Sequence, residues 1–352
     1  MLSAFRTHKR AIALCLCMLI CLSSVSLLCG CKSKADRENQ RVVGVCGSFD
    51  IPYEELRFVT MLYKQNLADK YGEGIWDDPA ASEENRAELE AEVMEHLREN
   101  YVILTACRER GLDTDSDAAD NYVEDQIDKM IQESFGGKTS GYRDFLKEQH
   151  MTDHYFRFAL KVSYMESALF YAMQDGGEFA YTKNNLTEFI DYVTTSPDYA
   201  RIIHVYIRND EGEDPAANLK EAQNITLALN AVHNDEDRVR VMNRYIGSAV
   251  NDDMDMVTKD GYYFTYGEMN KTYEAAAFAL KIGEVSDPVE CSGGYFVLLR
   301  LQPDEAYVMA NSSTLLTNWQ SARMGFVEDS YRSVCDVILN EEGAAIDLCA
   351  ME

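Results

Sequence analysis

The pattern of apolar and polar positions divides the chain into a helical part, an α/β part and a second helical part. A short apolar strand is predicted at Val42–Cys46. From Asp50 to Tyr71, and in five further stretches up to residue 194, apolar side chains recur at helical spacing. Pro52 fits the first turn of the helix that begins at Asp50, because its missing N–H costs little there.

The character of the pattern changes after Pro197. Residues 201–207 are rich in β-branched and aromatic side chains, which predicts a strand. Beyond Pro303 the helical spacing returns and continues to about residue 340. Between these points the pattern predicts helices at 216–232, 235–246 and 271–280, and strands at 262–264, 285–289 and 295–301.

Helices on both sides of the α/β part suggest one discontinuous helical domain with an inserted domain. The rest of the chain reads as an export signal followed by a polar tether. The predicted boundaries are 1–30 for the signal, 31–41 for the tether, 42–195 for the helical domain, 196–304 for the insert and 305–345 for a C-terminal helical segment that packs on the helical domain.

The first thirty residues have the three parts of an export signal. A short basic head precedes a mostly apolar run, Ala11–Leu28, and a small-residue exit follows. A transmembrane anchor is the alternative, because eighteen apolar residues nearly span a hydrocarbon core of about 30 Å. Three serines inside the run and Gly30 before Cys31 favour processing.

The segment Leu28-Cys29-Gly30-Cys31 resembles the lipobox of bacterial lipoproteins. The resemblance implies that Cys31 receives a diacylglycerol and becomes the new N-terminus. Two acyl chains suffice for stable anchoring, whereas one is marginal. We therefore expect a bacterial protein that is lipid-anchored on the extracytoplasmic face of the cell membrane.

The charge of the chain excludes some partners. The signal carries three basic and no acidic residues, which leaves 30 basic against 60 acidic residues and a formal charge of −30. This balance argues against nucleic-acid binding, which needs Lys and Arg to neutralise phosphates. It also argues against adsorption of the protein surface to anionic lipid.

Five cysteines remain after Cys31. They are scattered, odd in number and without CxxC spacing, which argues against a zinc site. An exported protein can form a disulfide, but the sequence does not pair them, and free buried thiols are the preferred interpretation. These residues are Cys46, Cys107, Cys291, Cys335 and Cys349.

Four blocks of the α/β part, at residues 200–205, 267–280, 283–289 and 294–298, resemble the parvulin-type (PpiC, rotamase) peptidyl-prolyl isomerases. Ala200–Val205 is similar to the first strand of that family, with its histidine. Gly267–Met269 followed by Tyr273–Leu280 resembles the segment that lines the prolyl pocket. Gly283–Val289 and Gly294–Leu298 resemble the closing strands.

The whole layout resembles the PrsA-like extracellular foldases, which are related to SurA-type chaperones. The resemblance implies an α+β fold: a parvulin-like small mixed sheet wrapped by helices, inserted into a discontinuous all-α chaperone domain. It implies a foldase that binds unfolded or partly folded exported polypeptides and isomerises prolyl bonds. No cofactor or metal is implied, and a homodimer is left open.

The same resemblance implies the site residues. His204 would lie on the floor of the site, and Asp252 or Asp253 would face the substrate carbonyl. The apolar pocket would be lined by Phe264, Met269, Tyr273, Phe278 and Phe296.

The sequence departs from the family at three places. Phe296 stands where the family usually has a second histidine, so His204 must find another partner. Tyr273 adds a hydroxyl to the pocket, and Lys259–Tyr263 replaces a glycine-rich segment. These changes keep two alternatives open: His204 as an ordinary core residue, and a non-catalytic client-binding chaperone with a degenerate parvulin domain.

Two other signals are set aside. His150 and His154 have the i, i+4 spacing of a metal pair, but no glutamate lies between them as in HExxH. Asn251–Asp255 hints at a calcium loop, but Met256 occupies the required glycine position.

Overall fold

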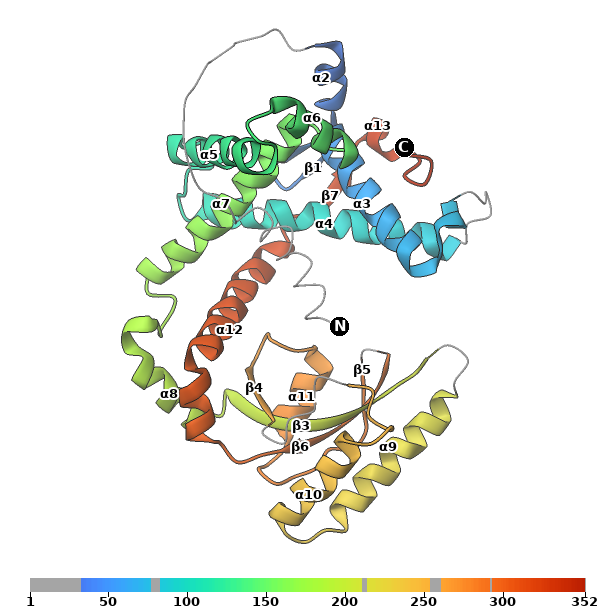
Figure 1. Cartoon of the computed structure of the whole chain (residues 1–352), viewed down its shortest axis with the longest axis vertical. Helices are drawn as coiled ribbons and strands as arrows, with labels where there is room; N and C mark the ends of the chain where they lie inside the picture. Colours follow the sequence, from blue (N-terminus) through green and yellow to red (C-terminus); the bar gives the residue numbers. More distant parts are fainter. Residues whose placement is uncertain (1–32, 77–82, 211–213, 254–260, 292, 352) are drawn as a thin grey trace. The chain divides into compact units, whose positions relative to one another are not determined.

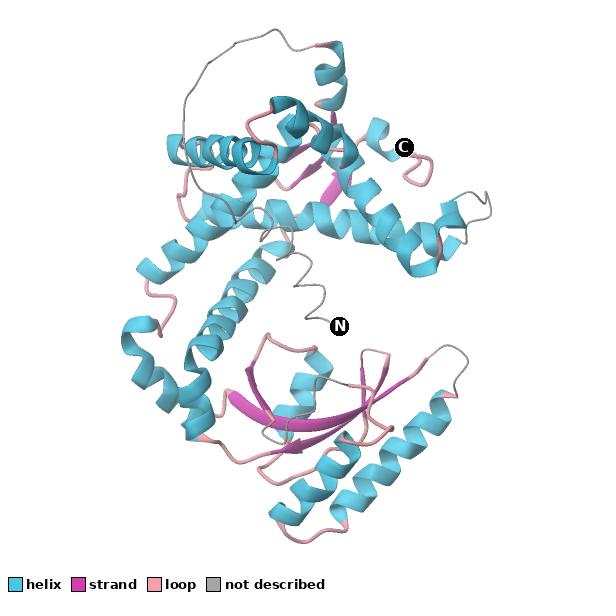
Figure 2. Ribbon diagram, viewed as in Figure 1, coloured by secondary structure: helices cyan, strands magenta, loops and turns pink. Residues whose placement is uncertain are grey.

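The computed structural model describes residues 33–76, 83–210, 214–253, 261–291 and 293–351. Helices predominate and two small sheets accompany them (Figures 1 and 2), which confirms the α+β class. The elements are α2 Lys34–Asn39, β1 Val42–Cys46, β2 Phe49–Pro52, α3 Tyr53–Tyr71, η1 Glu73–Trp76, α4 Glu83–Glu109, α5 Asp117–Ser134, α6 Thr139–Glu148, α7 Asp153–Asp175, η2 Lys183–Asn185, α8 Leu186–Thr195, β3 Tyr199–Arg208, α9 Pro215–Asn230, α10 Asp235–Ile246, β4 Tyr262–Thr265, α11 Lys271–Ala279, β5 Val289–Cys291, β6 Gly294–Arg300, α12 Glu305–Arg332, β7 Val337–Leu339 and α13 Glu341–Ala344.

The predicted export signal, its lipobox and Cys31 lie outside the described residues. Within the residues that the structure describes, none of the helices combines the length and the apolar character needed to cross a membrane.

The chain folds as two compact units. Unit 1 comprises Met1–Asp175 and Val327–Glu352, and unit 2 comprises Gly176–Phe326. The boundaries of these units differ from the predicted domain boundaries at residues 195 and 305, because α8 and most of α12 belong to unit 2. Aromatic packing explains this: Phe189 of α8 lies 6.1 Å from the ring of Trp319 in α12 and 6.3 Å from Tyr199 in β3.

Unit 1 carries a three-stranded antiparallel sheet in the order β2-β1-β7. The prediction that a helix begins at Asp50 is wrong by three residues, because β2 ends at Pro52 and α3 begins after it. Gly47, with a φ of 58°, allows the tight turn between β1 and β2.

The helical segment predicted after Pro303 begins with α12, which ends earlier than predicted. It stops at Arg332 rather than near residue 340, and Val337–Leu339 forms β7 instead. Val45 and Ile338 are paired across β1 and β7, and such β-branched pairs favour a sheet. The helical spacing of apolar residues therefore continued past the true helix end by coincidence.

The sheet of unit 2 has the order β4-β3-β6-β5. All its paired strands are antiparallel, so the predicted mixed sheet is wrong. Two successive helices, α9 and α10, separate β3 from β4 and return the chain to the end of β3. There the Asp252 amide donates to the Tyr206 carbonyl at 2.8 Å, and β4 pairs with the first residues of β3, Tyr199–Ile202.

The strand predicted at 285–289 is displaced. β5 spans Val289–Cys291, and Val285 forms only an isolated bridge with Leu299. Pro288 lacks an N–H and cannot continue a ladder through the predicted segment.

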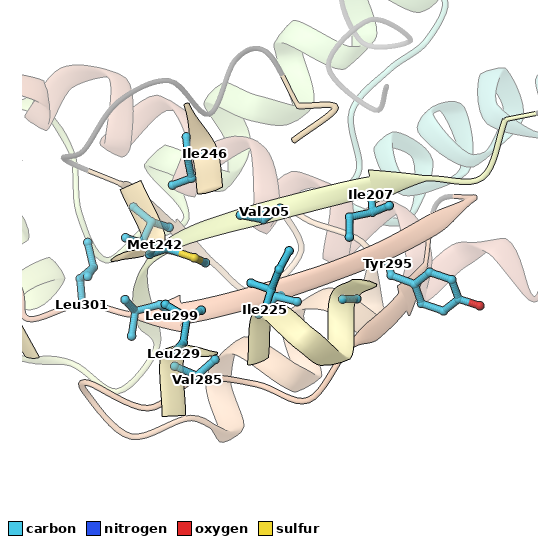
Figure 3. Packing of buried hydrophobic residues seen from close by; sticks show 13 residues of the cluster. Val205, Ile207, Ile225, Leu229, Met242, Ile246, Val285, Tyr295, Leu299 and Leu301 are labelled. Atoms are coloured by element: carbon cyan, nitrogen blue, oxygen red, sulfur yellow. The ribbon is translucent and has the colours of Figure 1, made fainter. Parts of the chain in front are cut away.

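The two faces of β3 serve different purposes because successive side chains alternate across a strand. Ile203, Val205 and Ile207 pack with α9, α10 and β6 in a buried apolar cluster (Figure 3). Ile202 lies on the opposite face, in the cluster that α11 covers. His204 shares that second face, which therefore positions the candidate site.

Candidate functional site

His204 is held at both ring nitrogens. Its side chain is 4% exposed, and Nε2 lies 2.9 Å from Oδ2 of Asp253, whose side chain is 30% exposed. Nδ1 lies 2.9 Å from the hydroxyl of Tyr273 on α11. The Tyr262 hydroxyl on β4 lies 3.3 Å from the same nitrogen. The partner that His204 must find in place of a second histidine is therefore a tyrosine.

The chemistry of the partners fixes the direction of these hydrogen bonds. An ionised carboxylate only accepts, so Nε2–H of His204 donates to Asp253, and in the tautomer with its proton on Nε2 the Nδ1 atom accepts from Tyr273. The Tyr262 hydroxyl lies 2.5 Å from the Tyr273 hydroxyl and can donate to it. The result is a single chain of donors that runs from Tyr262 through Tyr273 and His204 to Asp253.

Burial keeps both phenols protonated. Desolvation is the main cause that raises the pKa of Tyr273 well above its ordinary value, and the neighbouring Tyr262 raises it further. Desolvation also raises the pKa of Tyr262. Both side chains are therefore donors at neutral pH, as the chain of hydrogen bonds requires.

Phe296 closes one side of this network. Its ring meets the His204 ring edge to face at 5.0 Å and the Tyr273 ring at 5.2 Å. On its other side it stacks on Tyr206 at 4.3 Å. The position that the family usually gives to a second histidine thus supplies an apolar wall and no hydrogen bond.

The remaining predicted pocket residues gather in the same cluster. Met269 and Phe278 are partly buried and pack against the buried cluster that contains Phe264, which has no exposed surface. The Phe264 ring lies 5.5 Å from Phe278 and 5.8 Å from Tyr273. Phe264 and Tyr273 therefore form the base of the site, whereas Met269, Phe278 and Phe296 reach its surface.

Sequence reasoning missed Tyr266. Its ring stacks on Phe278 at 3.9 Å, and the residue is 41% exposed. Tyr262, Phe264 and Tyr266 alternate with period two, so an extended segment places them on one side. That alternation could have identified both tyrosines as neighbours of the pocket.

Sequence reasoning also missed Glu274, which positions Met269. This carboxylate is 6% exposed and accepts the backbone N–H groups of Gly267 and Met269, each at 2.8 Å. Two charge-assisted hydrogen bonds fix the turn before α11. A side chain of the following helix, α11, therefore fixes the backbone of the segment Gly267–Met269.

The structure distinguishes the two aspartates that the sequence left as alternatives. Asp253 bonds to His204, whereas the Asp252 carboxylate accepts the backbone N–H of Arg208 at 2.8 Å. Asn251 fixes the turn between them, since its Oδ1 accepts from the Tyr206 amide and its Nδ2 donates to the Asp253 carbonyl. The Asp252 side chain is thus held at the end of β3 and takes no part in the hydrogen-bond network around His204.

Neither of the two sequence signals for a metal leads to a cluster of ligands in the described part of the chain. His154 Nδ1 lies 2.5 Å from a carboxylate oxygen of Glu54, and the backbone of His150 is left-handed. The calcium-like segment is described only through Asp253, and Lys259 and Asp260 lie outside the described residues. Among the residues that are described, no group of three or more His, Cys, Asp or Glu side chains could hold a metal ion.

Comparisons with known proteins agree with this arrangement. Residues 204–302 match the family model of the PPIC-type PPIase domain, and residues 1–169 match that of the SurA-like N-terminal domain. The chain therefore belongs to the proteins that join a SurA-like N-terminal domain to a PPIC-type PPIase domain. This confirms the resemblance that the sequence motifs carried. No curated protein matches the chain.

Solved structures of related proteins are similar to the chain at low identity. The peptidyl-prolyl isomerase PrsA of Bacillus anthracis is 18% identical, with 68% of this chain and 94% of that one covered and a TM-score of 0.34. PrsA of Bacillus subtilis is also 18% identical, with 84% and 93% covered and a TM-score of 0.26. A SurA-like chaperone of Campylobacter jejuni is 14% identical, with 83% and 96% covered and a TM-score of 0.26.

Proposed function

We propose that this protein is a membrane-tethered extracytoplasmic foldase that isomerises prolyl bonds in unfolded or partly folded exported polypeptides. One observation carries the catalytic part. A partly exposed carboxylate, Asp253, is held by the buried His204, whose ring meets Phe296 at the edge of the apolar cluster that Met269 and Phe278 also join. The foldase role as a whole is supported by the two matched families.

This pairing suits rotation about an X–Pro bond. The barrier is about 18–20 kcal/mol and arises from amide resonance, which also places negative charge on the carbonyl oxygen. A fixed carboxylate beside that oxygen disfavours the planar amide more than the twisted one. An apolar surface holds the proline ring in both the planar and the twisted state of the amide. The site as a whole therefore binds the twisted state better. No covalent bond has to break.

Removing the charge of Asp253 is expected to lower isomerase activity. Asp253→Asn keeps the shape and removes the charge, so kcat/KM on a proline-limited peptide should fall roughly tenfold. Asp252→Asn is the matched control, because Asp252 bonds to the backbone of Arg208 and not to His204. Equal loss in both variants, or none in Asp253→Asn, would refute the assigned role of Asp253.

A non-catalytic client-binding chaperone remains the second candidate. Phe296 in the second-histidine position and the two phenols against His204 Nδ1 favour it, because they fill space beside the imidazole. Such a protein would suppress aggregation of an unfolded client and leave its proline isomerisation at the rate in buffer.

The tether is part of the proposal. The lipobox-like segment supports a diacylglycerol on Cys31, and the acidic composition argues against adsorption of the protein surface to lipid. A foldase held at the membrane would meet exported chains before they fold.

Replacing Cys31 by serine tests the tether. In a bacterial host with lipoprotein processing, the parent protein should incorporate a labelled fatty acid and sediment with membranes, because two acyl chains give stable anchoring. Cys31→Ser should lose the label. Cys29→Ser, two residues earlier, is the control that should keep it. A labelled Cys31→Ser protein would exclude this modification site.

A further inference from the structure

Two buried cysteines from opposite ends of the chain meet inside unit 1. Cys46 closes β1 and Cys335 lies between α12 and β7, and both are 0% exposed. The Cys46 thiol donates to the Cys335 carbonyl at 3.0 Å across 289 positions of sequence. The Cys335 sulfur lies 3.3 Å from Thr105 Oγ1 and 3.8 Å from the Tyr101 carbonyl of α4.

The two thiols also act on each other. Burial raises the pKa of Cys46 to about 12, and the charge of Cys335 is the next cause, with a hydrogen bond to the Cys335 thiol also contributing. The guanidinium of Arg98 opposes this rise and donates to the Cys335 carbonyl at 3.2 Å. Two thiols from distant segments therefore share one buried site, next to a fixed cation.

We propose that Cys46 and Cys335 are a redox modification site that closes to a disulfide when the chain folds in the presence of a disulfide oxidant. The structure contains both as free thiols. The pairing goes beyond the sequence, which does not pair any of the five cysteines. The cellular setting rests on the proposed export, since oxidants of this class act outside the cytoplasm, whereas the chemistry does not.

The reaction is thiol–disulfide exchange. One thiolate attacks a sulfur of the oxidant RS–SR, which forms a mixed disulfide and releases one RS⁻. The second thiolate attacks the protein sulfur of that mixed disulfide, forms the Cys46–Cys335 bond and releases the second RS⁻. The two protons of the cysteines end on the two RSH products, and the oxidant takes up both electrons.

Burial determines when the reaction takes place. A thiol with no exposed surface and a pKa of about 12 is rarely an accessible thiolate in the folded protein. We expect slow oxidation of the folded protein and rapid oxidation during refolding. Once formed, the bond would be shielded from reductants. It would join the two segments of unit 1, one of which precedes unit 2 in the sequence and the other of which follows it.

Peptide mapping tests the pairing. The full chain is reduced, unfolded and refolded in detergent with oxidised and reduced glutathione, and its free thiols are then blocked before trypsin digestion. Peptide 42–57 contains Cys46, and peptide 333–352 contains both Cys335 and Cys349. The variant Cys349→Ser leaves Cys335 as the only partner in that peptide. Cys349 is partly exposed, so the variant should fold.

The expected result is a linked pair of peptides 42–57 and 333–352 in both the parent protein and Cys349→Ser. In Cys335→Ser the linked pair should fall at least tenfold. The proposal is overturned if peptide 42–57 is recovered unlinked from the refolded parent protein, or if the link disappears in Cys349→Ser, which would assign the bond to Cys349.

Discussion

Replacing Phe264 by alanine is expected to destabilise unit 2 by about 3–5 kcal/mol, the usual cost of removing a large buried aromatic side chain. Phe264 has no exposed surface, and its ring contacts Tyr262, Tyr273 and Phe278. The loss would leave a cavity beside Tyr273 and Phe278. Isomerase activity should fall with it, because the network around His204 rests on the same ring.

Tryptophan fluorescence can follow this unit by itself. The chain has two tryptophans, and in a Trp76→Phe background only Trp319 of unit 2 remains. Urea unfolding of that protein should show a lower midpoint for Phe264→Ala. Phe278→Ala is the matched control, since this partly exposed ring should cost much less stability. Equal midpoints for the two variants would show that Phe264 does not support the site as described.

Replacing Glu55 by glutamine is expected to stabilise unit 1 above pH 7. Glu55 is fully buried, and desolvation raises its pKa from 4.5 to about 7, against hydrogen bonds from Tyr101 and Asn100 that lower it. The folded state therefore binds the proton more tightly than the unfolded state does. Stability from this group is complete below pH 4.5 and is lost as the pH rises through 7, by roughly 3 kcal/mol in all.

Glutamine can satisfy the same partners without a charge. The Tyr101 hydroxyl lies 2.5 Å from Glu55 and 3.1 Å from the Asp50 carbonyl. In Glu55→Gln the amide N–H can donate to Tyr101, which then donates to Asp50, while the amide oxygen accepts from Asn100.

Unfolding midpoints measured from pH 5 to 8 test the role of Glu55. The parent protein should lose stability across this range, and Glu55→Gln should lose much less. Some slope should persist, because burial also raises the pKa of Glu328 to about 7. Glu90→Gln, an exposed change on α4, should retain the parent slope. If the stability of Glu55→Gln changed with pH in parallel with that of the parent protein, the raised pKa of Glu55 in the folded state would be contradicted.

Much of unit 2 follows from its sequence. The β-branched residues of β3 define the strand, and their alternation places His204 on the face opposite Ile203 and Val205. The alternation of side chains along β3 does not predict which residue forms a hydrogen bond with His204 Nδ1. Tyr273 lies 69 positions away on α11, so the contact depends on how helix and sheet pack.

The same limit explains the other differences. Asp252 and Asp253 are adjacent, and only the folded turn at Asn251 decides which carboxylate meets His204. β7 pairs with β1 from almost the other end of the chain, and local spacing alone favoured a longer helix. Contacts between distant segments decided each of these cases, whereas locally determined helices such as α10 were predicted at their observed bounds.

The central claim is that the site around His204 and Asp253 isomerises prolyl bonds in client proteins. Its most direct test is the refolding of an unfolded client whose slow phase is limited by proline isomerisation, with the full chain present in catalytic amounts. We expect the rate of the slow phase to rise in proportion to the concentration of the protein. An unchanged rate, together with suppressed aggregation of the client, would contradict the claim and establish a holding chaperone instead.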